Sequence, residues 1–256
     1  MTDTLLHIEN LSKRFGGVVA CDDVSIDLAE GELHAVIGPN GAGKTTLIAQ
    51  LAGELAPDAG RIVFAGADIT ALPVWRRSLL GLARSFQVTS LFPEFTALDN
   101  VALAAQAHAG HSFHFWKDAR REGALRETAR AALDQVGMRD RANARVSRLS
   151  HGEHRQIEIA MALATAPRLL LLDEPMAGLG PDESARMLAL LRELKRQYTI
   201  VLIEHDMEAV FALADRISVL VYGRIIATGA PETVRADARV RQAYLGETDA
   251  AGAGHV

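Results

Sequence analysis

A glycine-rich segment followed by a lysine and a threonine has the clearest chemistry in this sequence. Residues 38–45 fit the pattern G-x-x-x-x-G-K-[ST]. Glycines let the backbone curl so that successive N–H groups point at phosphate oxygens. Lys44 is expected to reach the β- and γ-phosphates of a nucleotide, and the Thr45 hydroxyl is expected to ligate Mg²⁺. The expected nucleotide-binding residues are Gly38, Pro39, Asn40, Gly41, Ala42, Gly43, Lys44, Thr45 and Thr46.

Two acids directly follow an apolar run later in the chain. Leu169–Leu172 is strand-sized, and Asp173 and Glu174 come next. In parallel α/β sheets, ligands bind at the carboxyl ends of strands. Asp173 is therefore expected in the Mg²⁺ shell, directly or through water, and Glu174 is expected to orient or deprotonate an attacking water. Taken alone, the two acids also fit a solvated turn; beside a phosphate cradle the catalytic interpretation is favoured.

Short apolar, β-branched-rich runs are expected to form the strands that position these groups. They are Val18–Leu28, Leu33–Ile37, Arg61–Phe64, Leu169–Leu172, Thr199–Ile203 and Ile217–Val221. Helical patterns lie at Lys44–Ala52, Glu183–Gln197 and Met207–Ala214. The alternation predicts an α/β fold with a largely parallel, buried sheet. The N-terminal strands, within Leu5–Leu28, are expected to be antiparallel and peripheral.

The middle of the chain has a different pattern. Residues 86–164 contain no evident strand run, and apolar residues from Leu125 to Val136 recur at helical spacing before a stop at Gly137. We expect a mostly helical subdomain at 86–164, inserted into a core formed by residues 1–85 and 165–248. The whole of 1–248 would then be one domain, followed by a flexible tail at 249–256.

Composition limits the class of protein. The 256 residues are 49% hydrophobic and 23% charged, which excludes a chain that is mainly disordered. The net charge of −5 argues against nucleic acid as a partner, because that affinity needs clustered basic residues. The single cysteine, Cys21, cannot form an internal disulfide and suits a reducing compartment. No signal peptide and no run of ~18–20 apolar residues is evident, so no membrane span is expected.

A third motif suggests a family. Residues 149–153 read Leu-Ser-His-Gly-Glu and resemble the LSGGQ signature of ABC-type ATPases. Gln87 looks like the glutamine of that family's Q-loop, and residues 177–180 look like its D-loop. His205 lies where the family has its switch histidine, and Phe15 lies where an aromatic ring stacks on adenine. These motifs occur in the family's order along nearly the whole chain.

The resemblance implies a P-loop NTPase (RecA-like) core with an antiparallel β subdomain and an inserted α-helical subdomain. It implies ATP and Mg²⁺ as cofactors, catalytic roles for Glu174, His205 and Gln87, and a place for Gln87 in the metal shell. It also implies that two chains bind ATP head to tail. The residues expected to meet the γ-phosphate held by the other chain are Ser150, His151, Gly152 and Glu153.

Three positions depart from the family pattern. His151 replaces the first glycine of the signature, Glu153 replaces its glutamine, and Gly180 replaces the usual Asp or Asn of the D-loop. Gly152 is retained, so backbone N–H groups can still approach a phosphate. Independently of the family, Ser150 and Glu153 form an S-x-x-E pattern that predicts a capping box at a helix start.

The finer resemblance is to ATP-binding subunits of branched-chain amino-acid importers. It implies a second ATPase subunit, identical or related, with transmembrane permease subunits, a periplasmic or extracytoplasmic binding protein and no nucleic acid. The expected location is the cytoplasmic face of the inner membrane. Importers of urea and short amides, and lipopolysaccharide exporters, share some of these motifs and stay open as alternatives. A soluble non-transport ABC ATPase, a P-loop kinase and a GTPase are the rivals from other classes.

One apolar group and one group of histidines were not part of these motifs. We hypothesise that Leu91, Phe92 and Phe95 line a groove for a helix of the permease. His108, His111 and His114 recur at every third position, but Gly110 interrupts them and neither cysteine nor acid is close in sequence. They are interpreted as an exposed loop or helix end, not as a metal site.

Overall fold

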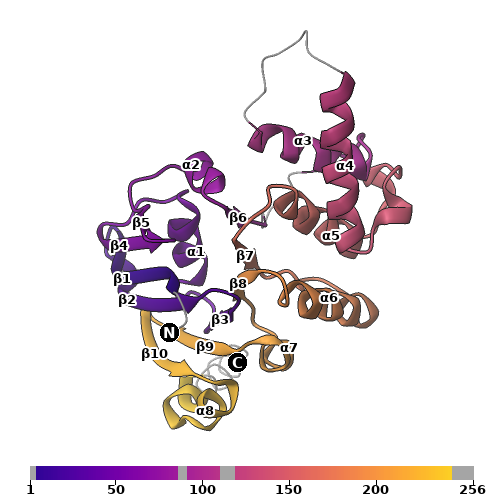
Figure 1. Ribbon diagram of the computed structural model, residues 1–256. Coiled ribbons are helices and arrows are strands. Elements are labelled where there is room, and N and C mark those ends of the chain that lie inside the picture. Colours follow the sequence, from indigo (N-terminus) through magenta and orange to yellow (C-terminus); the bar gives the residue numbers. More distant parts are fainter. Residues whose placement is uncertain (1–3, 86–90, 110–118, 244–256) are drawn as a thin grey trace. The chain divides into compact units, whose positions relative to one another are not determined.

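The computed structural model describes residues 4–85, 91–109 and 119–243 (Figure 1), with the side chains of 119–122 left aside. The chain divides into two compact units. The first combines Met1–Arg77 with Lys195–Val256, and the second is Ser78–Leu194. The glycine-rich loop and His205 belong to the first unit, whereas the acid pair and the signature-like segment belong to the second. The subdomain boundaries expected near residues 85 and 165 stay a prediction.

The first unit contains an antiparallel sheet near the N-terminus. Its strand order is β2-β1-β4-β5, and the strands are β1 (Thr4–Phe15), β2 (Val18–Ala29), β4 (Ala59–Phe64) and β5 (Ala67–Asp68). Along β2, Val24, Ile26 and Leu28 are buried and alternate with exposed Ser25 and Asp27. This period of two is typical of a sheet with one face against a core. The expectation of antiparallel N-terminal strands is confirmed.

A second, mainly parallel set of strands in the first unit carries the glycine-rich loop. The strands run in the order β10 (Arg224–Gly229), β9 (Arg216–Val221), β3 (Leu33–Ile37) and β8 (Thr199–Ile203). β3 pairs in parallel with β8 and β9, and every residue of β3 and β8 is buried. The helices of this unit are α1 (Lys44–Ala52), α7 (Met207–Leu213), α8 (Pro231–Ala236) and most of α2 (Val74–Leu79).

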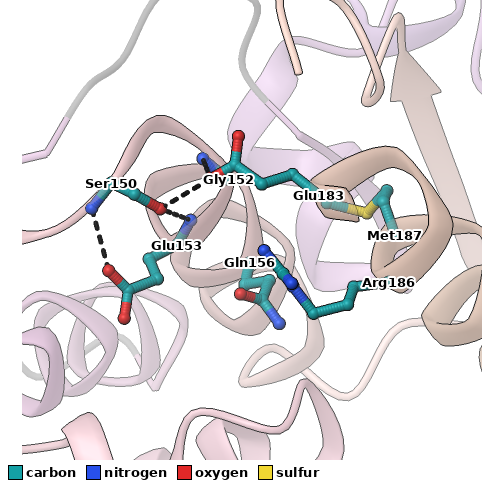
Figure 2. Close-up of a pocket in the computed structure, with 7 residues that line it drawn as sticks. All are labelled: Ser150, Gly152, Glu153, Gln156, Glu183, Arg186 and Met187. Carbon is teal, nitrogen blue, oxygen red and sulfur yellow. Dashed lines mark hydrogen bonds between the residues drawn. The ribbon is translucent and has the colours of Figure 1, made fainter. Parts of the chain in front are cut away.

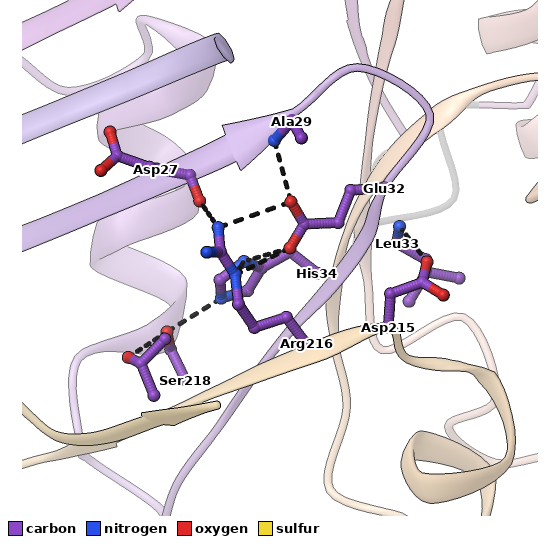
Figure 3. Close-up of polar contacts among 9 residues, drawn as sticks. Asp27, Ala29, Glu32, Leu33, His34, Asp215, Arg216 and Ser218 are labelled. Carbon is purple, nitrogen blue, oxygen red and sulfur yellow. Dashed lines mark hydrogen bonds and ion pairs between the residues drawn. The ribbon is translucent and has the colours of Figure 1, made fainter. Parts of the chain in front are cut away.

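A buried polar cluster fixes the start of β3 (Figure 3). His34 has its Nδ1 atom 3.2 Å from Glu32 Oε1 and its Nε2 atom 2.8 Å from Ser218 Oγ. Arg216 places Nε 2.8 Å from the same Glu32 oxygen. His34 and Arg216 therefore both lie within ion-pair distance of the Glu32 carboxylate. The cluster ties β3 to β9, and so sets the position of the strand that ends at the glycine-rich loop.

The second unit is mostly helical. Its helices are α3 (Ala97–His108), α4 (Ala119–Gln135), α5 (His151–Leu163) and α6 (Pro181–Leu194), with 3-10 turns at Arg139–Arg141 and Val146–Arg148. Helices α3, α4 and α5 pack against one another (Figure 1). Gly137, two residues after the end of α4, takes a φ of 72°, which confirms the expected helix stop.

Two parallel strands complete this unit, β6 (Leu82–Arg84) and β7 (Leu169–Asp173). The sequence patterns predicted β7 but missed β6, because three residues show no period. Helix α6 was expected at Glu183–Gln197. It begins two residues earlier than that, at Pro181, and ends three residues earlier, at Leu194. Throughout the described ranges, the helices are too short or too polar to cross a membrane.

Candidate functional site

The loop between β3 and α1 is a backbone cradle that only glycine permits. Gly43 has a φ of 107°, and a Cβ atom there would lie 2.0 Å from the carbonyl oxygen of Ala20. A Cβ at Gly38 would lie 2.0 Å from the carbonyl oxygen of Leu220. No side chain fits at either distance, so the two glycines let the loop pack tightly on its neighbours. Gly38 and Gly43 are therefore required for the packing of this loop.

Lys44 and Thr45 begin helix α1 at the end of this loop. The Lys44 ammonium is buried and donates to the carbonyl oxygens of Gly38, at 2.5 Å, and Pro39, at 3.0 Å. Thr45 is exposed, and the N-cap residue Gly43 has no side chain to bind the first N–H groups of the helix. Exposed helix N–H groups beside a lysine suit the oxygens of a phosphate, and the threonine hydroxyl suits Mg²⁺.

His205 emerges at the same edge of the sheet as the glycine-rich loop. β3 and β8 run parallel, with Val36 opposite Ile203, so the residues that follow each strand lie at one edge. The His205 side chain is 60% exposed, whereas the adjacent Glu204 is fully buried. The histidine is thus presented to solvent at the edge that carries the cradle. Within the first unit, the structure brings these two predicted elements together.

Phe15 ends strand β1 in the same unit. Its ring is 50% exposed, and the Lys13 ammonium lies 5.8 Å from the ring centroid. An exposed aromatic face can stack on a planar base. With half of its surface exposed, Phe15 is not part of the core.

Asp173 and Glu174 differ sharply in surroundings although they are adjacent. Asp173 is the last residue of β7 and is buried, and its Oδ2 atom lies 2.8 Å from Arg84 Nη2. Glu174 is partly exposed and has a φ of 49°, which is uncommon for a residue with a side chain. Strained backbone of this kind clusters at functional sites, where it aims a side chain. The pair therefore offers one anchored and one accessible carboxylate.

The segment expected to hold Gln87 follows β6. The last described residue before it, Ser85, donates its N–H to the carbonyl oxygen of Leu171 at 2.9 Å, so the chain leaves β6 beside β7. Gln87 itself lies outside the described residues.

Helix α5 begins with the predicted capping box. Ser150 Oγ accepts from the Glu153 N–H at 3.3 Å, and the Glu153 carboxylate accepts from the Ser150 N–H at 2.8 Å. Ser150 is exposed, not turned into the interior of its unit. The tip of α5 therefore lies at the surface, with its first hydrogen-bonding groups held in a fixed arrangement (Figure 2).

Glu183, which sequence reasoning did not select, occupies that tip. Its Oε1 atom accepts from Ser150 Oγ at 2.8 Å and from the Gly152 N–H at 3.3 Å (Figure 2). Chiefly the Ser150 hydrogen bond holds the pKa of the Glu183 carboxyl below its ordinary value. The only sequence signal for it was an acid in the first turn of a helix, which favours the helix start and points to no ligand.

His151 contacts the backbone that follows the acid pair. Its Nε2 atom donates to the carbonyl oxygen of Ala177 at 3.3 Å, and a Cβ at Gly178 would lie 3.4 Å from the same ring atom. The histidine that replaces the first signature glycine therefore joins the tip of α5 to the D-loop-like segment. Gly180 has no side chain that could do so.

The candidate groove for a partner helix is only partly as expected. Phe92 and Phe95 are 54% and 46% exposed, with ring centroids 5.4 Å apart. An open groove of about 360 Å³ is lined by Phe95, Leu103 and Leu125 among others. Leu91, in contrast, is buried and cannot line an exposed surface.

The three histidines near the end of α3 are only partly visible. His108 has its Nδ1 atom 3.3 Å from Ser78 Oγ, whereas His111 and His114 lie outside the described residues. In residues 4–85, 91–109 and 119–243, no group of three His, Cys, Asp or Glu side chains could hold a metal ion.

Comparison with known proteins adds independent findings. The model of the family described as ABC transporter matches residues 21–177, and that described as branched-chain amino acid ATP-binding cassette transporter matches residues 224–250. The chain is 38% identical to the high-affinity branched-chain amino acid transport ATP-binding protein LivG of Salmonella typhimurium, covering 96% of this chain and all of the relative. It is 36% identical to the lipopolysaccharide export system ATP-binding protein LptB of Acidithiobacillus ferridurans, with 95% and 97% covered.

Solved structures agree with these similarities. The crystal structure of an ATP-binding cassette of an ABC transporter in its ADP conformation superposes with a TM-score of 0.84. The two chains are 31% identical, and the match covers 96% of this chain and all of the other. The α/β fold with antiparallel strands and a helical part, expected from the motifs, is confirmed.

Proposed function

This chain belongs to the ABC transporter family of ATP-binding proteins, and on that premise we propose that it is the ATP-hydrolysing subunit of a branched-chain amino-acid importer. The similarity to LivG covers nearly the full length of both chains. The match over residues 224–250 supports the same subgroup, because it lies outside the nucleotide-binding motifs. The single observation that carries an ATPase is the glycine cradle between β3 and α1, with Lys44 at its end.

Each predicted residue has a role in this proposal. Lys44 and the loop N–H groups bind the β- and γ-phosphates, and the Phe15 ring stacks on the adenine. Thr45 and Asp173 would hold Mg²⁺, Asp173 directly or through water. When bound, the metal neutralises charge on the phosphates.

Water activation falls to Glu174, the accessible member of the acid pair. The carboxylate accepts a proton from the water that attacks the γ-phosphate. His205 contacts the γ-phosphate from the edge of the sheet that carries the cradle. Gln87 has the catalytic role and the place in the metal shell that its motif implies.

The chain works as a pair. It has one phosphate cradle and one signature-like helix tip, so we propose that two chains meet head to tail, with the Ser150 tip of each against the triphosphate of the other. The second chain is an identical copy or a related subunit. Only contacts to the γ-phosphate distinguish the closed pair from the open one, so these contacts supply the free energy of closure.

Closure of the pair pushes on permease subunits. The exposed rings of Phe92 and Phe95 supply an apolar surface for a permease helix. This arrangement puts the protein on the cytoplasmic face of the cell membrane, with a binding protein on the other side delivering the amino acid.

Uptake in cells tests the proposed substrate. A strain lacking this gene should lose most uptake of labelled leucine, isoleucine and valine, and the wild-type gene should restore it. A Glu174→Gln copy should not restore uptake, whereas an Asp182→Asn copy, which changes an exposed acid by the same charge, should.

The similarity to LptB supports one second candidate, an export function. Unchanged amino-acid uptake in the deletion strain, together with lipopolysaccharide retained in the inner membrane, would favour export. Permease subunits that co-purify with the tagged protein from membranes would separate the two cases directly.

A further inference from the structure

The structure points to Glu183 as a built-in competitor of the γ-phosphate at the tip of α5. We propose that its carboxylate must leave Ser150 and Gly152 before the partner's ATP can bind there, and that it thereby sets how much ATP the pair needs to close. This inference rests on the proposed function, in which those two residues meet the γ-phosphate across the dimer.

The first argument is the identity of the donors. The Ser150 hydroxyl has one hydrogen, and it is directed to Glu183 Oε1 at 2.8 Å. The Gly152 N–H also has one hydrogen, and it points at the same oxygen at 3.3 Å. An incoming phosphate oxygen needs these same hydrogens. The carboxylate and the phosphate cannot both hold them, so one anion excludes the other.

The second argument is space. A Cβ atom at Gly152 would lie 2.8 Å from Glu183 Oε1, so the carboxylate rests directly on the helix tip (Figure 2). The cavity that remains beside it, lined by Gln156, Arg186 and Met187 among others, measures about 30 Å³. This is the space of a few water positions. The side chain must therefore rotate away, not merely share the site.

The third argument is charge. A carboxylate and a triphosphate are both anions, and like charges within about 4–6 Å of each other disfavour one another's charged form. Arg186 is close enough to act electrostatically on Glu183, and the Gly180 N–H also donates to the carboxylate. These groups hold the carboxylate near α6. A diphosphate has no γ-phosphate oxygens to displace it, so the contact distinguishes ATP from ADP.

A purely structural role makes the opposite prediction. If Glu183 only orients Ser150 for the phosphate, its removal weakens ATP-driven pairing. If it competes, its removal strengthens pairing. The two roles therefore shift the same measurement in opposite directions.

The test uses the full chain with Glu174→Gln, so that bound ATP is not consumed. Glu183→Gln keeps an oxygen acceptor for Gly180 but removes the charge, and Glu183→Leu removes both. Dimerisation is followed by size-exclusion chromatography with light scattering across an ATP titration. In both variants, we expect the ATP concentration for half-maximal dimerisation to fall about threefold to tenfold, the range of one net hydrogen bond.

Three controls make the result specific. Asp182→Asn removes the neighbouring charge and should leave the titration unchanged, because Asp182 is not among the described groups that contact Ser150 or Gly152. Binding of a fluorescent ATP analogue to the monomer should be equal in all variants. Melting temperatures report whether loss of the α6 cap has unfolded a variant.

The possible failures are distinguishable. If the Glu174→Gln parent does not dimerise with ATP, the proposed function fails. If the parent dimerises but a folded Glu183 variant needs the same ATP concentration or more, the competition is overturned. Should one of the two variants not fold, the other decides the outcome by the same criterion.

Discussion

The guanidinium of Arg84 lies 2.8 Å from the carboxylate of Asp173, and the two side chains are only 9% and 1% exposed. The arginine ends β6 and the aspartate ends β7, two strands that pair in parallel. No role was assigned to Arg84 from the sequence, and its contact with Asp173 was not foreseen. The contact makes Asp173 a fixed charge whose position depends on β6.

Removing Arg84 should therefore act first on the stability of the fold, and on the reaction only as a consequence. Arg84→Ala breaks the buried ion pair with Asp173, which we expect to lower the free energy of unfolding by about 3–5 kcal/mol. Urea denaturation of the full chain measures this loss. Arg148→Ala, an exposed arginine in the same unit, is the matched control and should change the unfolding free energy by less than about 0.5 kcal/mol. Equal losses in the two variants would contradict the assignment.

Lys44→Ala should abolish tight nucleotide binding and leave the fold intact. In the structure the Lys44 ammonium donates to the loop carbonyl oxygens of Gly38 and Pro39, which places its charge at the expected phosphate site. We expect ATP affinity to fall by about tenfold or more, since a charged contact to the phosphates is lost. Isothermal titration gives the affinity. Wild-type affinity in a folded variant would remove Lys44 from the site.

Glu174→Gln should bind ATP and dimerise, but turnover should fall by about 10²–10⁴-fold, the usual contribution of a general base. Phosphate release measures the rate. Asp182→Asn, a charge-matched change at an exposed acid, should retain the wild-type rate. Near-normal turnover in Glu174→Gln would mean that another group activates the water.

Phe92→Ala with Phe95→Ala should uncouple the ATPase from its permease. The two rings are exposed, so their loss leaves little cavity in the fold, and the basal rate of phosphate release should stay within about twofold. Stimulation by reconstituted permease should drop by about fivefold or more, as expected when interface aromatics are truncated. Tyr222→Ala, which removes another exposed ring, serves as the control. Equal stimulation in the double variant would refute the groove.

Acid should weaken the cluster that fixes the start of β3. Burial raises the pKa of Glu32, but hydrogen bonds from His34 and Ala29 and the charge of Arg216 outweigh it and hold the pKa below its ordinary 4.5. A lowered pKa in the folded state means that the stabilisation is present above pH 4.5 and is lost as pH falls through the folded value.

Glu32→Gln should therefore lower the free energy of unfolding by about 1–2 kcal/mol at pH 7. The difference from wild type should shrink below pH 4.5, where the wild-type carboxylate becomes protonated. Urea denaturation between pH 3.5 and 7 measures both effects. A difference that does not change with pH would assign the stabilisation to packing and not to charge.

The sequence alone predicted the structural features that are formed by consecutive residues. The Gly38–Thr45 loop, its flanking strand Leu33–Ile37 and helix Lys44–Ala52, and the Ser150–Glu153 capping box were all predicted with their bounds. Local backbone rules fix each of them, because glycine conformations, helix starts and apolar runs are properties of neighbouring residues.

Only the tertiary structure decided which distant side chains meet. Ser150 and Glu183 are 33 residues apart, and Arg84 and Asp173 are 89 apart. No periodicity in the chain links such pairs, since they meet only after strands and helices have packed. A hydrogen bond between side chains depends on that packing to within a few tenths of an ångström. The sequence thus determined the parts of an ATPase, and the fold determined which anion sits at the tip of α5.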